Sequence, residues 1–352
     1  MKRLTLLLTG VMMVGVVALA TAGDFHVGTT LVCSDCHVAH YSQSHGYSVG
    51  GAFMPLGSGG PYANLLRDDE NKVCLACHNG QSFAPDVFGL NGGTSYVRQA
   101  GGLNVAAGNG LTNDAGYDLI DGHTLYSTDM PPGSTGSAYA PSAIGLRCID
   151  CHAQHGSAAQ YRNLLNRGIF TGDTLTYAIG TNDLTKDVFE RTAGTMATAY
   201  TVDNIDFNEP NTRMSHYGNW CKACHTQFHG MGGDANMGGL AGGVTSTNAT
   251  PWKRHPTADV NIGEAGSSAT YISSLAQYAG HTNKVKVMDS QGLWTGTGTD
   301  NTVTPSCMSC HKAHGNQNGF GLIFMKGTGT VTEEGDGGVY KDLCRQCHTE
   351  GA

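Results

Sequence analysis

One five-residue pattern, Cys-x-x-Cys-His, recurs six times along the chain and contains every cysteine. It begins at Cys33, Cys74, Cys148, Cys221, Cys307 and Cys344. Such a pentad can attach a haem covalently, because its two thiols form thioethers with the vinyl groups and the adjacent His becomes the proximal ligand of the iron. A zinc site or a redox dithiol would not require His directly after the second Cys. The sequence therefore predicts six covalently bound haem c groups.

The residues predicted to hold these groups form two sets, one for the porphyrin and one for the iron. The attachment residues are Cys33, Cys36, Cys74, Cys77, Cys148, Cys151, Cys221, Cys224, Cys307, Cys310, Cys344 and Cys347. The proximal ligands are His37, His78, His152, His225, His311 and His348. In an oxidising compartment twelve uncommitted thiols would pair into disulfides, so commitment of each Cys to a cofactor accounts for the cysteine surplus.

Six irons need six second ligands for full coordination, and ten His lie outside the pentads. The candidates are His26, His40, His123, His155, His229, His255 and His314. We interpret His45, His216 and His281 as exposed residues or as neighbours of the ligands. Twelve Met offer another ligand type. Met usually fills gaps in apolar packing, however, so the surplus of His favours bis-histidine coordination.

Four of these candidates follow a proximal His at close range. His40, His155 and His314 stand three residues after one, and His229 stands four residues after His225. A residue three or four positions on lies only about 5–6 Å away on the same side of its own haem. It must therefore bind a different iron or none, and the alternative is a surface residue or a hydrogen-bond partner of a propionate. If these residues are ligands, neighbouring porphyrins come close to contact, which is the geometry of an electron wire.

The elements that position these residues are expected to be short. The chain has 352 residues with 51 Gly, 39% hydrophobic and 14% charged residues, which is little apolar and charged material for a globular domain of this length. We expect a multihaem c-type cytochrome fold in which the haem stack serves as the core. Most of the chain should be irregular, with short helices confined to the attachment motifs and little sheet. Gly-rich stretches such as 101–113 and 232–250 predict long connections.

The pentads divide the chain into modules. We predict a signal peptide at 1–22, a two-haem module at 23–100, a central region with haems three and four at 101–295, and a second two-haem module at 296–352. In each outer module a C-x-x-C-H-x-x-H unit, an apolar element and a second pentad follow one another. The apolar elements are Leu65 with Leu66 and residues 322–324, and Leu164 with Leu165 follows the third pentad in a similar place.

The first residues indicate export. Lys2 and Arg3 precede an apolar run that ends in small residues around Ala20 and Ala22, which is typical of a secretory signal peptide. A retained membrane anchor is the alternative, but the run is interrupted by polar residues and Gly and is shorter than the ~20 apolar residues of a spanning helix. With 20 Lys and Arg against 28 Asp and Glu, the net charge of −8 argues against a nucleic-acid partner.

A series of short stretches supports a family resemblance. They are Phe25 with His26, residues 36–40, the close second pentad, residues 151–156, Trp220 before Cys221, His229, residues 254–256, residues 310–314 and the sixth pentad near the carboxyl end. In this order they resemble the OmcS family of hexahaem outer-surface cytochromes from metal-reducing bacteria, along the whole mature chain. The resemblance implies bis-histidine haems and head-to-tail filaments with a continuous haem stack. It also implies that His40 binds the haem of His311 in the next subunit.

We therefore expect a non-enzymatic protein for long-range extracellular electron transfer, secreted to the cell surface and polymerised into a nanowire. Expected partners are other copies of the chain, upstream outer-membrane cytochromes, and extracellular electron acceptors such as metal oxides. The alternative is a monomeric carrier in the periplasm or at the outer membrane. A multihaem reductase is a third hypothesis, but it needs an iron with an open distal site, and the supply of His can close every site.

Overall fold

The computed structural model describes part of every pentad. The described residues are 26, 31–38, 47–49, 52–54, 59–81, 84, 86–87, 104–105, 123–131, 142–155, 161–165, 217, 220–221, 223–225, 261–263, 273–282, 284–288, 303–316, 319–323 and 339–349. The predicted signal peptide and five histidines lie outside them. These histidines are His40, His45, His216, His229 and His255.

Short helices mark the attachment pentads. They are α2 (Cys33–Cys36), α3 (Glu70–His78), the 3₁₀ turn η2 (Cys148–Asp150), α7 (Cys307–Cys310) and α8 (Tyr340–Cys344). In five pentads the His N–H donates to the carbonyl of the first Cys at 2.9–3.1 Å, and the second pentad forms the last turn of α3. Residues three and four apart share one face of a helical turn, so each pentad presents two thiols and a ring to the same side.

Three further 3₁₀ turns and two small sheets complete the elements that carry the sites. The turns are η1 (Ala63–Leu65), η3 (Tyr161–Asn163) and η5 (Gly319–Gly321). Strand β1 (Tyr47–Val49) pairs antiparallel with β2 (Ala52–Met54), with Ser48 opposite Phe53. Strand β3 (Asn104–Val105) pairs parallel with β4 (Thr124–Leu125). Over the described residues, the expected short helices at the pentads and the small amount of sheet are confirmed.

One helix differs from the expectation that helix is confined to the pentads. Helix α6 (Leu275–Gly280) begins after Ser274, whose hydroxyl accepts from the N–H of Gln277 at 3.2 Å. Tyr278 on this helix is fully buried and donates its hydroxyl to the carbonyl of Val285 at 2.6 Å. The N–H of Ser274 donates to the carbonyl of Cys347 at 2.7 Å. The prediction was wrong here because an apolar protein core, as well as the attachment motifs, stabilises helix.

That apolar core lies beside the fifth and sixth pentads. Its buried members are Tyr217, Ile262, Tyr278, Val285, Val287, Met288, Val303, Met308 and Ile323, and the partly buried Cys310 and Cys347 pack against it. Met288 and Met308 thus serve as packing residues, as expected for this side chain. A smaller cluster pairs Leu75 of α3 with Leu125 of β4. The haem stack as a core stays a prediction, and the polypeptide contributes apolar packing of its own.

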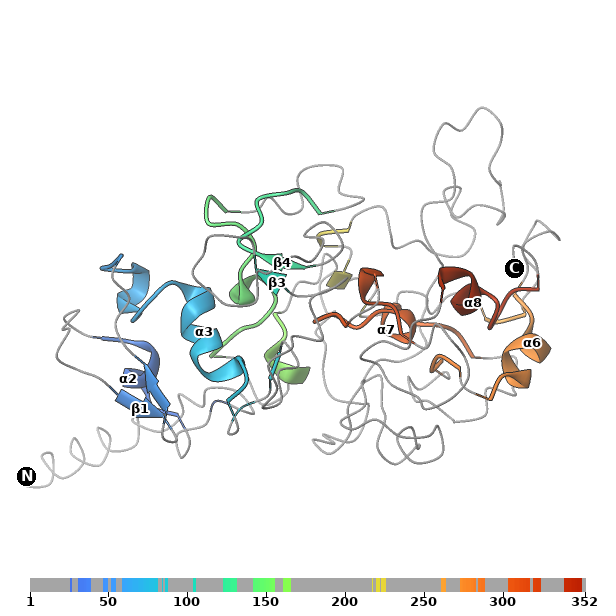
Figure 1. Cartoon of the computed structure of the whole chain (residues 1–352), viewed down its shortest axis with the longest axis horizontal. Helices are drawn as coiled ribbons and strands as arrows, with labels where there is room; N and C mark the ends of the chain where they lie inside the picture. The colour runs from blue at the N-terminus through green and yellow to red at the C-terminus, as the bar shows by residue number, and fades with distance from the viewer. Residues whose placement is uncertain are drawn as a thin grey trace, which may run out of the picture.

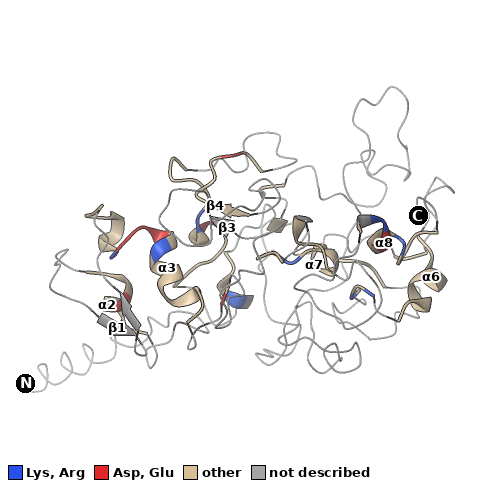
Figure 2. Ribbon diagram, viewed as in Figure 1, with Lys and Arg blue, Asp and Glu red and all other residues tan. Residues whose placement is uncertain are grey.

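The pentad elements follow one another along the long axis of the molecule. Helices α2 and α3 lie toward one end, β3 and β4 near the middle, and α7, α8 and α6 toward the other end (Figure 1). Charged residues of both signs gather at the start of α3 and along α8 (Figure 2). They include the ion pairs Lys72–Asp69 at 3.3 Å and Arg345–Asp342 at 3.5 Å. Within the described segments, no helix has the length and apolar character needed to cross a membrane.

Candidate haem-binding sites

The odd-numbered pentads carry a polar side chain that closes their own turn. Asp35 accepts from the N–H of Val32 at 2.7 Å, and Asp150 accepts from the N–H of Arg147 at 2.9 Å. Ser309 accepts from the N–H of Ser306 at 2.9 Å. Asp35, Asp150 and Ser309 are all buried, and each stands just before the second Cys. These side chains satisfy amide groups at the start of the turn that would otherwise lack a partner.

The predicted proximal His of each odd-numbered pentad is oriented by a backbone carbonyl. Nδ1 of His37 lies 2.8 Å from the carbonyl oxygen of Asn64. The corresponding distances are 3.0 Å from His152 to Arg162 and 2.8 Å from His311 to Phe320. Because a carbonyl only accepts, Nδ1 must carry the proton in each ring, which leaves the lone pair of Nε2 for a metal.

The three accepting carbonyls belong to turns of one shape. Asn64, Arg162 and Phe320 are the central residues of η1, η3 and η5, and their φ angles of 55°, 50° and 59° lie in the left-handed region. That conformation is unfavourable for residues with a Cβ. It turns the carbonyl back toward the pentad, which explains why three unrelated residue types adopt it.

The apolar elements noted in the sequence fix these turns to the pentads. Isolated bridges join His37 to Leu66, His152 to Leu164, and His311 to Leu322. In the first module the N–H of Val38 donates to the carbonyl of Leu65 at 2.7 Å. Equivalent bonds run from Ala153 to Asn163 and from Lys312 to Gly321. The repeat read from the sequence therefore corresponds to a repeated local structure that holds the proximal His.

Four pairs of histidine rings face one another, and each pair joins a pentad His to a His from elsewhere in the chain. Their ring centroids are 6.0–6.1 Å apart. The pairs are His37 with His155, His78 with His26, His152 with His314, and His225 with His123. A metal–imidazole nitrogen bond is about 2 Å long, and each ring centroid lies about 1 Å behind its nitrogen. Two imidazoles on opposite sides of one metal therefore have centroids about 6 Å apart, so these residues fit a bis-histidine iron.

Two of the second-ligand candidates are oriented in the same manner as the proximal residues. Nδ1 of His26 lies 3.2 Å from the carbonyl oxygen of Gln154, and Nδ1 of His123 lies 3.0 Å from that of Ala313. Gln154 and Ala313 directly precede His155 and His314. The segment after the third pentad thus provides a ring that faces His37 and a carbonyl that orients His26, both in the preceding module. The segment after the fifth pentad does the same for His152 and His123.

The pKa values of most of the perturbed pentad thiols are raised, with Cys74 as the exception. Burial, as the largest cause, raises the pKa of the Cys36, Cys310 and Cys347 thiols to about 12. Reactive dithiols and metal-binding thiolates have lowered values instead. Burial also lowers the pKa of His152 and His311, which favours the neutral imidazole that binds metals. None of the twelve Cys forms a disulfide, which is compatible with their predicted use as attachment residues.

Of the other histidines outside the pentads, the structure describes His281 but not the candidates His40, His229 and His255. His281, which we interpreted as exposed or as a neighbour of a ligand, is partly buried, and its Nε2 lies 3.3 Å from the carbonyl oxygen of Arg345 in the sixth pentad. His40, His229 and His255 lie outside the described residues. The second ligands at the His311 and His348 sites therefore stay predictions.

Sequence reasoning missed the backbone groups that orient the ligands. The carbonyls of Asn64, Arg162 and Phe320 have no residue type in common, so no side-chain pattern announces them. A usable signal was the Asp or Ser before the second Cys of the odd-numbered pentads, where the even-numbered pentads have Ala76, Ala223 and Gln346.

Comparison with known proteins points to a c-type cytochrome. The chain is similar to C-type cytochrome OmcS of Geobacter sulfurreducens. The two sequences are 24% identical over 354 aligned positions, which cover 82% of this chain and 78% of OmcS. This similarity confirms the resemblance to OmcS noted from the motifs. No family model matches the chain, and no solved structure matches it.

Proposed function

We propose that this chain is a hexahaem c-type cytochrome for extracellular electron transfer. The observation that supports this most directly is the set of four His pairs, each of which joins a pentad His to a distant His at 6.0–6.1 Å. Similarity to C-type cytochrome OmcS, whose name describes a c-type cytochrome, supports the same class of protein.

In this proposal the chain binds, orients and encloses its cofactors and supplies no reacting group. Each pair of Cys forms two thioethers, and the two facing His bind the iron. When bound, haem iron supplies a one-electron ferric/ferrous couple whose potential depends on its ligands and their hydrogen bonds. The carbonyls of Asn64, Arg162 and Phe320 fix the rings of His37, His152 and His311. A His on both sides of an iron leaves no position for a substrate, which favours an electron carrier over a reductase.

Several contacts link neighbouring sites into a path. His152 and His155 are three residues apart, yet their rings face different partners, His314 and His37. The sulfur-bearing side chains of Cys74 and Cys148, in the second and third pentads, lie next to each other. In the fifth and sixth pentads, Cys310 and Cys347 pack against the same apolar cluster. Because the pentads also follow the long axis (Figure 1), electrons would pass along the molecule from module to module.

The internal pattern also supports assembly between copies. His155 faces the proximal His37 of the preceding module, and His314 faces the proximal His152 of its preceding module. His40 has the same place in the first module, so in this proposal it faces the proximal His of a module in another copy. The equivalent partner is His311 of another copy. Repeated head-to-tail contacts of this kind build an open filament unless they close a ring.

The proposed location and partners rest on the predicted signal peptide and on the similarity to OmcS. The chain would be exported to the outer surface, receive electrons from outer-membrane cytochromes, and pass them to acceptors such as metal oxides. A monomeric carrier in the periplasm is the alternative, and it predicts a complete ligand set within one chain.

The test is purification from a host that matures c-type haem, followed by denatured mass, visible and electron paramagnetic resonance spectra, and electron microscopy. We expect six added haems, low-spin ferric iron in assembled material, and filaments. Fewer than six haems, or high-spin iron in assembled material, would contradict the hexahaem bis-histidine cytochrome. A protein that stays monomeric at high concentration with six six-coordinate haems would favour the soluble carrier.

A further inference from the structure

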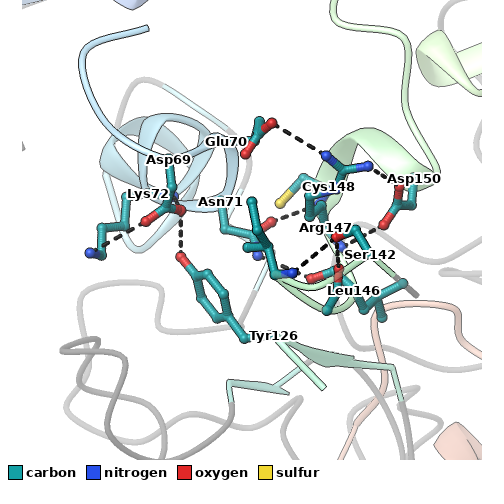
Figure 3. A network of polar contacts seen from close by, with 12 residues as sticks. Asp69, Glu70, Asn71, Lys72, Tyr126, Ser142, Leu146, Arg147, Cys148 and Asp150 are labelled. Carbon is teal, nitrogen blue, oxygen red and sulfur yellow. Dashed lines mark hydrogen bonds and ion pairs between the residues drawn. The ribbon is translucent and has the colours of Figure 1, made fainter. Parts of the chain in front are cut away.

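The side chain of Asn71 joins the second pentad to the third. Asn71 lies in the first turn of α3 and is only 1% exposed. Its Oδ1 accepts from the N–H of Cys148 at 2.8 Å, and its Nδ2 donates to the carbonyl of Leu146 at 3.1 Å. The amide thus binds the backbone on both sides of Arg147 (Figure 3). Both groups of the side chain are satisfied, so the contact defines one relative position of the two segments.

Residues on either side of Asn71 extend the same junction. Glu70 accepts from Nη1 of Arg147 at 3.3 Å, and Asp69 accepts from the hydroxyl of Tyr126 at 2.7 Å. Figure 3 shows these contacts leaving one end of α3 toward the segments that precede the third pentad. Leu75 of α3 and Leu125 of β4 form an apolar cluster in the same place. The junction is therefore both polar and apolar, and Asn71 is its buried polar member.

The position of Asn71 on its helix connects this junction to the attachment residues. Cys74 follows Asn71 by three residues, so the two side chains share one face of α3. Asn71 holds the backbone of Cys148, and the side chains of Cys74 and Cys148 lie next to each other. The contact thus places the first thiol of pentad two against the first thiol of pentad three.

We propose that Asn71 is a positioning residue that sets the separation between the haems of pentads two and three. The inference rests on the proposed function, because it concerns one step of the electron path. Asn71 binds no haem itself. It acts through Cys148, whose thioether anchors the third haem, and through α3, which carries the second.

The test compares Asn71→Leu with Lys72→Ala in the fully loaded protein. Leu has the same number and branching of side-chain heavy atoms as Asn and removes both hydrogen bonds, whereas Lys72 is more exposed and pairs with Asp68 and Asp69 just before α3. Magnetic coupling between ferric haems and the rate of internal electron exchange after partial photoreduction are measured in both variants. We expect Asn71→Leu to retain six haems, to lose part of the coupling, and to slow exchange at least several-fold. Lys72→Ala should match the wild type.

Unchanged coupling and exchange in a six-haem Asn71→Leu protein would overturn the proposal and leave the cytochrome function intact. A wild type without six low-spin haems would instead overturn the function. If Asn71→Leu does not mature, hydrogen exchange of the Cys148 amide in the wild type decides. Strong protection supports the buried bond to Asn71, and rapid exchange at Cys148 overturns it.

Discussion

The ring of His314 faces the ring of His152 at a centroid distance of 6.0 Å, although His314 stands only three residues after another pentad His, His311. The same relationship joins His155 to His37 at 6.1 Å. His155 and His314 therefore each face a ring of the module before their own. This arrangement explains how neighbouring sites are held close without long connecting elements between them.

Removal of His155 should open the first site and spare the third. In His155→Ala we expect one haem to become high-spin and to bind carbon monoxide on reduction, because the facing ring at His37 is lost. Carbon monoxide titration and ferric spectra measure this change. His281→Ala is the control, since His281 contacts the backbone at Arg345, and it should create no carbon monoxide site. Normal bis-histidine spectra in His155→Ala would show that His155 is not a ligand.

The left-handed conformation of Phe320 predicts an unusual pattern of substitutions. Phe320 has φ 59° and an exposed side chain, so little buried area is lost on truncation. Phe320→Gly should fold at least as well as the wild type, because Gly adopts this conformation without steric cost. Phe320→Val should lower the free energy of unfolding by about 1–2 kcal/mol relative to Phe320→Gly. Denaturant unfolding of the two loaded variants compares them, and equal stability would contradict the requirement for a left-handed turn.

The polar residue before the second Cys should tune the potential of its haem. Ser309 is fully buried where the first and third pentads have Asp. In Ser309→Asp, a negative charge would stabilise ferric iron and lower one midpoint potential. A unit charge about 10 Å away at an effective dielectric constant of about 20 contributes about 1.7 kcal/mol. Because 1.4 kcal/mol corresponds to about 59 mV for one electron, we expect a decrease of roughly 50–100 mV.

Spectropotentiometric titration measures that decrease, and Ser309→Asn provides the uncharged control of similar size. Asn can also accept the hydrogen bond from Ser306, so the two variants differ mainly in charge. A similar decrease in Ser309→Asn would assign the change to packing and not to charge.

Removal of His40 should separate haem loading from assembly. If His40 binds the His311 haem of the next copy, His40→Ala should retain export and six haems, weaken polymerisation, and open one haem to carbon monoxide. Filament imaging and carbon monoxide titration on the same preparation test both effects. Filaments of normal length with no new carbon monoxide site would refute the ligand in trans.

The sequence by itself determined which residues can hold haem. A Cys-x-x-Cys-His pentad is a local motif, since two thiols and a ring within one helical turn are enough to define an attachment site. The sequence alone also shows ten further His and the three-residue spacing after His37, His152 and His311. Because a short tether cannot reach around its own haem, this spacing already indicated that His155 and His314 must bind another iron if they bind one.

Only the tertiary structure decided which rings face each other and which groups orient them. His26 stands seven residues before Cys33, yet its ring faces His78 and not His37. The carbonyls at Asn64, Arg162 and Phe320 are backbone groups, available at every residue, and only a left-handed turn directs them at a His. Asn71 likewise has its role only because folding brings residues 146–148 against α3. Pairings between distant segments depend on the packing of the whole chain, which no local pattern of residues records.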